Sequence, residues 1–102
     1  MEEVKINGMI DGKLTVALSG DIHSGNADDF YERVAAAYDE QPADLFFDGE
    51  KLNFIDSTAL GVFVKLLKKA KADGHTLTLC ALQAKIKKLF VICSLDSIME
   101  IL

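Results

Sequence analysis

The sequence predicts one α/β domain built on a mixed, mainly parallel sheet with packed helices. The chain has 102 residues, of which half are hydrophobic, and neither a repeat nor a low-complexity tract interrupts it. Segments with the spacing of strands alternate with segments with the spacing of helices, which requires a mainly parallel sheet and right-handed crossovers. A chain of this length supports a single core. We therefore expect one domain over residues 1–102 with the order ββαβαβαβ.

An antiparallel hairpin is expected at the start of this order. Residues 13–19 alternate larger hydrophobic side chains with small or polar ones, and we expect this strand to stop at Gly20-Asp21. Residues 4–10 form a second apolar stretch. Asp11-Gly12 lies between the two stretches and favours a two-residue turn, because both positions tolerate positive φ.

A helix and a central strand are expected next. From Ala27 the hydrophobic residues follow the helical period, with Ser24 or Asn26 as the N-cap. Pro42 ends this unit, and residues 43–47 form a short apolar run typical of a strand that is covered on both faces. The expected buried stripe of the helix comprises Ala27, Phe30, Tyr31, Val34, Ala37 and Tyr38.

The remaining elements are two helices and two strands. We expect a second helix from residue 57 to about residue 72, a strand over 75–80, a third helix over 83–93 and a last strand over 98–102. Asp73-Gly74 is a helix stop signal. On a wheel of the second helix the hydrophobic side chains cover an arc of about 200°. The rest of that wheel is occupied by Ser57, Gly61, Lys65, Lys68 and Lys69.

Composition excludes several classes of protein and site. The apolar runs are far shorter than the roughly 20 residues that span a bilayer, and the start of the chain is not basic, so we expect a cytoplasmic protein without membrane insertion. Cys80 and Cys93 lack a C-x-x-C spacing and are expected to be buried free thiols, with Cys93 on the inner stripe of the third helix. His23 and His75 have no neighbouring ligand residue, so no metal site is expected.

The charge is unevenly distributed along the chain. Residues 1–56 contain 13 acidic and 4 basic side chains, whereas residues 57–102 contain 3 acidic and 7 basic ones. The lysines are not interleaved with aromatic residues, so we interpret them as solvated helix faces and expect no nucleic-acid partner. Residues 20–25 lack the G-x-G-x-x-G spacing, and G-x-S-x-G is absent, so neither a nucleotide enzyme nor a serine hydrolase is expected.

The start of the second helix has two interpretations that physical reasoning leaves open. Asp56 stands at the N-cap, so its carboxylate accepts the free N–H groups of the first turn and leaves the Ser57 hydroxyl unused. Asp-Ser-Thr is then either a capping cluster alone or a phosphorylation site, because a helix N-terminus tolerates a phosphate. Periodicity does not exclude Thr58 as the acceptor. Gly61 lies one turn further along the same face, where it allows a partner's backbone to approach closely.

The same residues carry a resemblance to a known family. Residues 18–30, 45–82 and 86–101 resemble a STAS domain of the bacterial anti-sigma-factor antagonists, and the resemblance covers essentially the whole chain. Its most specific motif is Asp56-Ser57-Thr58-Ala59-Leu60-Gly61, which follows a hydrophobic strand. In the antagonists a C-terminal helix follows the last strand, whereas this sequence ends at Leu102. The sheet is then less covered, which favours a homodimer.

The resemblance implies a partner-switching function without a cofactor. The antagonist would bind an anti-sigma factor with serine kinase activity, be phosphorylated at Ser57, be released, and be reset by a serine phosphatase. Gly20, Asp21, Ile22 and His23 would contact this partner, together with Asp56, Ser57, Thr58 and Gly61. The alternative is an unphosphorylated STAS scaffold, such as an accessory subunit of a lipid-transport or stressosome-type complex, because the fold alone does not select a function.

Overall fold

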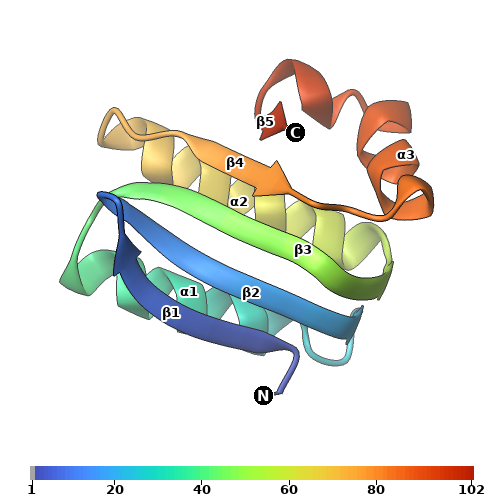
Figure 1. The fold of residues 1–102 in the computed structure, drawn as a ribbon, viewed down its shortest axis with the longest axis horizontal. Helices are drawn as coiled ribbons and strands as arrows, with labels where there is room; N and C mark the ends of the chain where they lie inside the picture. The colour runs from blue at the N-terminus through green and yellow to red at the C-terminus, as the bar shows by residue number, and fades with distance from the viewer. Residues whose placement is uncertain (1) are drawn as a thin grey trace.

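A five-stranded sheet is the framework of the computed structural model, which describes residues 2–102. The strands lie in chain order across the sheet (Figure 1). β1 (Val4–Ile10) pairs antiparallel with β2 (Lys13–Ile22), while β3 (Asp44–Ile55), β4 (Leu77–Cys80) and β5 (Glu100–Ile101) continue the sheet in parallel. The predicted fold class and order of elements are confirmed.

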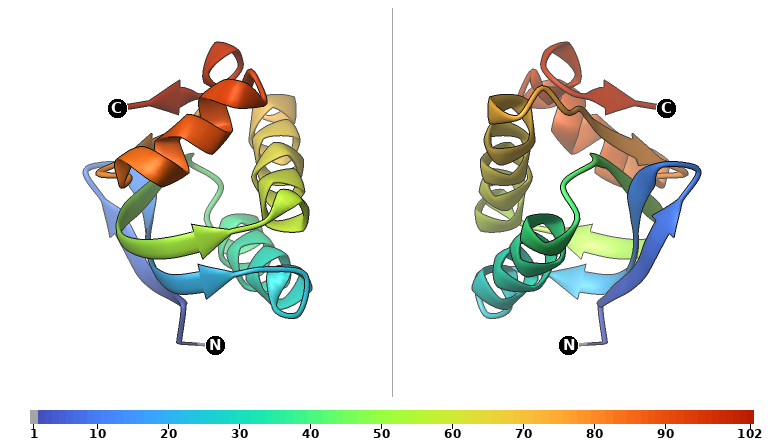
Figure 2. Two further views of the ribbon diagram at one scale, coloured as in Figure 1. Left: turned by 90° about the vertical axis from the view of Figure 1, so that its right-hand side faces the viewer. Right: turned by 90° about the vertical axis from the view of Figure 1, so that its left-hand side faces the viewer.

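The two long helices lie on the same side of this sheet. α1 (Ala27–Glu40) and α2 (Ser57–Ala72) run side by side over one face, and no helix of residues 2–102 covers the other face of the central strands (Figure 2). Leu45 and Phe47 of β3 are therefore buried, whereas Phe46 between them is only half-buried. The prediction that residues 43–47 are covered on both faces is wrong, because both crossover helices pack on the same face.

A short α3 (Ala84–Ile92) and a 3-10 turn η1 (Leu95–Ser97) follow β4 and close the end of the core. Phe63 of α2 is the centre of this core, with ring centroids 5.2 Å from Phe30, 5.4 Å from Phe47 and 5.4 Å from Phe90. Edge-to-face pairs of this kind contribute about 0.5–1.5 kcal/mol each beyond the burial of their area. One aromatic cluster thus joins α1, β3, α2 and α3.

Two strands are longer than the sequence predicts. β2 continues beyond Gly20-Asp21 to Ile22, and β3 continues to Ile55, because their ends pair with each other in the registers Asp21↔Phe54 and Ile22↔Ile55. The register shifts before Ser19 and again after Gly20. These irregularities break the two-residue alternation, which is why the pattern of hydrophobic residues places the strand ends too early.

The edge strand β1 contains a further irregularity. Its register with β2 shifts between Ile6 and Gly8, and Gly8 adopts a φ of +83°. A positive φ is strained for residues with a side chain, so glycine is the residue expected at this bulge. β1 lies at the margin of the sheet and pairs only with β2.

A partly buried polar cluster joins the C-terminal half of α1 to the end of α2. The Tyr38 hydroxyl donates to Asp73 Oδ2 at 2.7 Å and lies 2.8 Å from His75 Nδ1. Burial, followed by the hydrogen bond and charge of Asp73, raises the pKa of Tyr38 to about 12. Because His75 is held in this cluster, β4 begins at Leu77, two residues later than predicted.

The third helix ends earlier than predicted, and this changes the position of Cys93. α3 ends at Ile92, so Cys93 is the C-cap residue and is exposed. Cys80 is half-buried, and this partial burial raises the pKa of its thiol. The prediction of two buried thiols is therefore wrong for Cys93, because its backbone has already left the inner stripe of the helix.

Candidate functional site

The candidate site lies at the carboxyl ends of β2 and β3. Because Ile22 pairs with Ile55, the loop after β2 and the start of α2 leave the sheet side by side, at the end that faces the viewer in Figure 2, left. Two segments that are more than 30 residues apart in the sequence meet here. Crevices outside the carboxyl ends of parallel strands are common locations for functional sites.

Asp56 connects these two segments through one carboxylate. Its Oδ1 accepts the Ala59 N–H at 2.9 Å, and its Oδ2 accepts the Ser24 N–H at 2.9 Å. The Ala59 N–H is the main cause that lowers the pKa of Asp56. Burial is the second largest effect and opposes it, while the N–H groups of Ser24 and Thr58 and the charge of His23 lower the pKa further. The predicted N-cap is confirmed. The bridge to Ser24 could not be foreseen from spacing.

Ser57 is exposed and opens the first turn of α2. Its hydroxyl makes no hydrogen bond within residues 2–102, because Asp56 already supplies the cap. Thr58 is exposed as well. The structure therefore presents two adjacent hydroxyl side chains to solvent at the N-terminus of a long helix.

Gly61 lies one turn along the exposed side of α2. A Cβ atom added there would meet nothing within 4 Å, and its φ is not in the region that favours glycine. Glycine in a helix interior is less stable than alanine by about 0.5–1 kcal/mol. The fold therefore has no need of glycine at this position.

The loop after β2 contributes exposed polar groups. Asp21 and His23 are exposed, and Gly20 adopts a φ of +63°. His23 Nδ1 accepts the Gly25 N–H at 3.0 Å, so the imidazole is held by its own loop. Ile22 is fully buried, and its side chain cannot reach a partner. We therefore assign Ile22 to the core and correct its predicted place on the contact surface.

The expected N-cap of α1 takes part in the same loop. Asn26 occupies the N-cap position, but its side chain does not cap the helix. Instead its Oδ1 accepts the His23 N–H at 2.9 Å and its Nδ2 donates to the Asp21 carbonyl at 3.0 Å. Ser24 is not the N-cap of α1 either, because it lies two residues before that position, and its N–H donates to Asp56 Oδ2. These bonds fix the loop in one conformation.

Phe54 is a site residue that sequence reasoning did not single out. It pairs with Asp21 at the end of β3, and 49% of its surface is exposed. The signal was present, because Phe54 and Ile55 are adjacent in a strand and only one of them can face the core. An exposed aromatic ring at the strand end that leads into α2 is typical of a protein contact surface.

Within residues 2–102 no hydrogen bond pairs Ser57 with a histidine, since His23 Nδ1 accepts from Gly25. His75 is bonded to Tyr38 near the C-terminal end of α2, far along the helix from Ser57. Within residues 2–102 no group of three or more His, Cys, Asp or Glu side chains is placed to hold a metal ion. No helix of the described chain is long and apolar enough to cross a bilayer.

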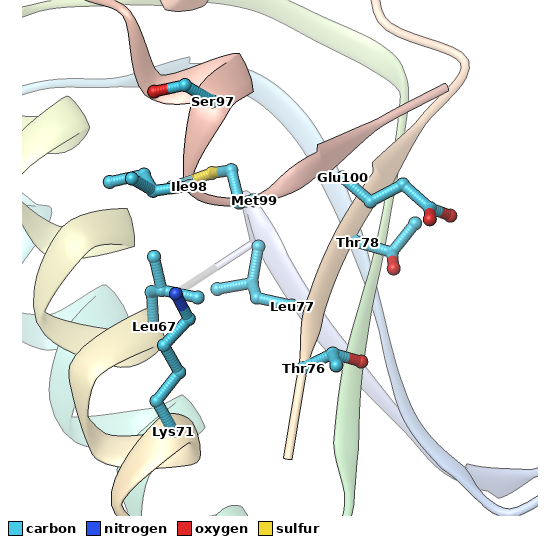
Figure 3. Close-up of a pocket in the computed structure, with 9 residues that line it drawn as sticks. All are labelled: Leu67, Lys71, Thr76, Leu77, Thr78, Ser97, Ile98, Met99 and Glu100. Atoms are coloured by element: carbon cyan, nitrogen blue, oxygen red, sulfur yellow. The ribbon is translucent and has the colours of Figure 1, made fainter. Parts of the chain in front are cut away.

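A hollow in the structure is also remote from the site. It encloses about 240 Å³ beside the C-terminal half of α2 and is lined by Leu67, Lys71, Leu77 and Met99 among others (Figure 3). No residue of the candidate site lines it. The site is thus an exposed surface of loop, strand end and helix start, which suits contact with another macromolecule better than enclosure of a small ligand.

Comparison with known proteins identifies the family of this fold. Residues 3–102 match the family described as STAS domain. The chain is 40% identical over 62 residues to the anti-sigma-B factor antagonist of Bacillus subtilis, covering 61% of this chain and 57% of that protein. It is 29% identical over 92 residues to BtrV of Bordetella bronchiseptica, covering 90% of this chain and 79% of BtrV. The structure of TM1081 from Thermotoga maritima superimposes with a TM-score of 0.81 at 26% identity, covering 96% of this chain and 82% of TM1081.

Proposed function

The chain belongs to the STAS domain family, and from this premise we propose that it is an anti-sigma factor antagonist controlled by phosphorylation of Ser57. In this function the protein binds an anti-sigma factor that is also a serine kinase, in the cytoplasm. Phosphorylation dissociates this complex, and a serine phosphatase restores the form that binds. The observation that carries the proposal is the free, exposed hydroxyl of Ser57 beside an Asp56 that already caps the helix.

The fold is suited to accept a phosphate at this position. The first N–H groups of a helix and the positive end of its dipole stabilise negative charge. A phosphoserine carries a charge of about −1.5 to −2 near neutral pH. Ser57 has no buried contact to lose, since it faces solvent. Phosphorylation is therefore expected to leave the core intact.

The surroundings of Ser57 explain why the same charge would release a partner. Gly61 is exposed one turn further along α2, and the exposed residues Asp21 and Phe54 pair at the strand ends next to the start of this helix. Gly61 allows a partner's main chain to approach α2, which accounts for a glycine that the fold does not need. A phosphate in the centre of such a contact would be desolvated beside the carboxylate of Asp56, and burying unpaired charge is costly.

We assign the phosphate to Ser57 rather than Thr58. Both hydroxyls are exposed, so accessibility does not distinguish them. Ser57 occupies the serine of the antagonist motif, and it lies on the same exposed side of α2 as Gly61. Phosphopeptide mapping after incubation with ATP and the cognate kinase tests this. Label on Thr58, or undiminished label in Ser57→Ala, would contradict the assignment.

Affinity capture from the native cell tests the function as a whole. Wild-type and Ser57→Asp baits are compared by mass spectrometry, with Lys68→Ala as a control for an exposed change on the same helix. The expected result is a histidine-kinase-like ATPase recovered by the wild-type and Lys68→Ala baits and lost with Ser57→Asp. Recovery of membrane transport components by all three baits would instead assign the protein to a constitutive scaffold.

A further inference from the structure

The outward side of α3 combines positive charge with uncovered aliphatic side chains. Lys85, Lys87 and Lys88 are exposed, and Val91 and Ile92 expose 48% and 65% of their surfaces. We refer to these five residues as the α3 face. Its members share the outward side of one helix, whose inner side packs on the core through other residues.

The fold accounts for the inner side of α3 but for little of the α3 face, where Lys85 Nζ donates to Asn53 Oδ1 at 3.2 Å. Ile86 and Phe90 are buried, and Phe90 joins the aromatic cluster. Lysines in the first turns of a helix meet the positive end of its dipole, which is unfavourable. Lys87 and Lys88 have no ion-pair partner in the described part of the chain. Residues that weaken their own helix, as these lysines do, are expected where a surface serves a function.

The charge of the α3 face is opposite to that of the N-terminal half of the chain. The three lysines are the only charged residues between Asp73 and Asp96, in a protein whose net charge is −5. α1 and the hairpin of β1 and β2, which carry many of the acidic residues, lie at the opposite edge of the molecule (Figure 1). The α3 face is therefore a local positive surface on an acidic protein.

We propose that the α3 face docks reversibly on an anionic membrane surface. The lysines would lie among the phosphate groups, and Val91 and Ile92 would enter the interfacial layer. The three exposed lysines complement the charge of an anionic lipid surface, and the exposed aliphatic side chains of Val91 and Ile92 on the same side of the helix suit its interfacial layer.

Sedimentation with vesicles tests this proposal on the full chain. The wild type is expected to bind vesicles of phosphatidylglycerol and phosphatidylethanolamine but not vesicles of pure phosphatidylcholine. It should dissociate as the salt concentration is raised. Each lysine contributes about fivefold to binding of an anionic surface, so joint replacement of Lys85, Lys87 and Lys88 by Gln should weaken binding about a hundredfold. Ile92→Ser should weaken it about tenfold through lost apolar burial.

A control variant distinguishes binding through the α3 face from a general effect of the protein's charge. Joint replacement of Lys65, Lys68 and Lys71 by Gln removes the same charge from exposed positions of α2 and should leave vesicle binding unchanged. An equal loss in this control, or failure of the wild type to bind anionic vesicles, would overturn the proposal. Binding to poly-L-glutamate without binding to vesicles would assign the face to an acidic protein and also overturn it. Ser57→Asp should bind vesicles normally, so this test is independent of the proposed switch.

Discussion

The two sides of α2 differ in what determines their residues. The inner side packs Ala59, Phe63 and Leu66 into the core, where each is fully buried. The outer side presents Ser57 and Gly61, and neither makes a side-chain contact that the fold requires. Substitutions on the inner side should therefore change stability, whereas those on the outer side should change binding. Variants on each side of α2 test this separation of stability from binding, and the largest effect is expected in the core.

The inner side is tested by Leu67→Ala, with Lys68→Ala as its neighbour on the outer side. Leu67 is 3% exposed, and its truncation should lower the free energy of unfolding by about 2–5 kcal/mol through lost burial and a residual cavity. Lys68 is exposed, so its truncation should change stability by less than about 0.5 kcal/mol. Urea denaturation measures both. Equal midpoints would show that the two sides are not distinct.

Ser57→Asp tests the outer side, where we expect binding to change and stability to be kept. The helix dipole should maintain stability or raise it by about 0.3–1 kcal/mol. Binding to the cognate kinase should fall a hundredfold or more, equivalent to about 2.7 kcal/mol. Calorimetry measures binding and thermal melting measures stability. Unchanged affinity, or a large loss of stability, would eliminate the proposed switch.

Gly61→Ala should raise stability and weaken partner binding, each by a small amount. Alanine should stabilise the helix by about 0.5–1 kcal/mol, because the added methyl group meets open space. The same methyl group should weaken partner binding if a main chain approaches there. The two measurements are the urea midpoint and the dissociation constant. Improved binding together with improved stability would show that Gly61 is not a contact position.

Asp56 should add a smaller, pH-dependent effect at the boundary between the two sides. Its pKa is lowered in the folded state, chiefly by the Ala59 N–H, so its ionised form stabilises the fold above the unfolded pKa of about 3.9. This contribution is lost as pH falls through the lowered folded pKa. The stability difference between wild type and Asp56→Asn, measured by urea titration at several pH values, should therefore shrink in acid. A difference that grows in acid would contradict this.

The inner side of α2 could be predicted from the sequence almost completely, because helical periodicity depends on local spacing. Of its predicted hydrophobic residues only Val64 is half-buried rather than buried. The N-cap at Asp56 was predictable for the same reason. Local rules thus sufficed wherever one helix determined its own geometry.

Non-local geometry limited the rest of the prediction. The bond between Asp56 and Ser24 spans 32 positions, and no spacing rule indicates it. The burial of Ile22 follows from its pairing with Ile55 beyond two register shifts, which the alternation of residues does not reveal. The assignment of Cys93 failed because the end of a helix shifts a side chain from inside to outside within one residue. These errors all lie at element ends, where the tertiary fold decides.

The bulge in β1 affects how the domain behaves at high concentration. An edge strand of seven residues offers free N–H and C=O groups to a neighbouring molecule, and a regular strand of this length invites open-ended sheet growth between copies. At Gly8 the backbone turns out of regular register, so a second edge could not pair along the whole strand. The irregularity therefore opposes sheet growth from one copy to the next along this edge.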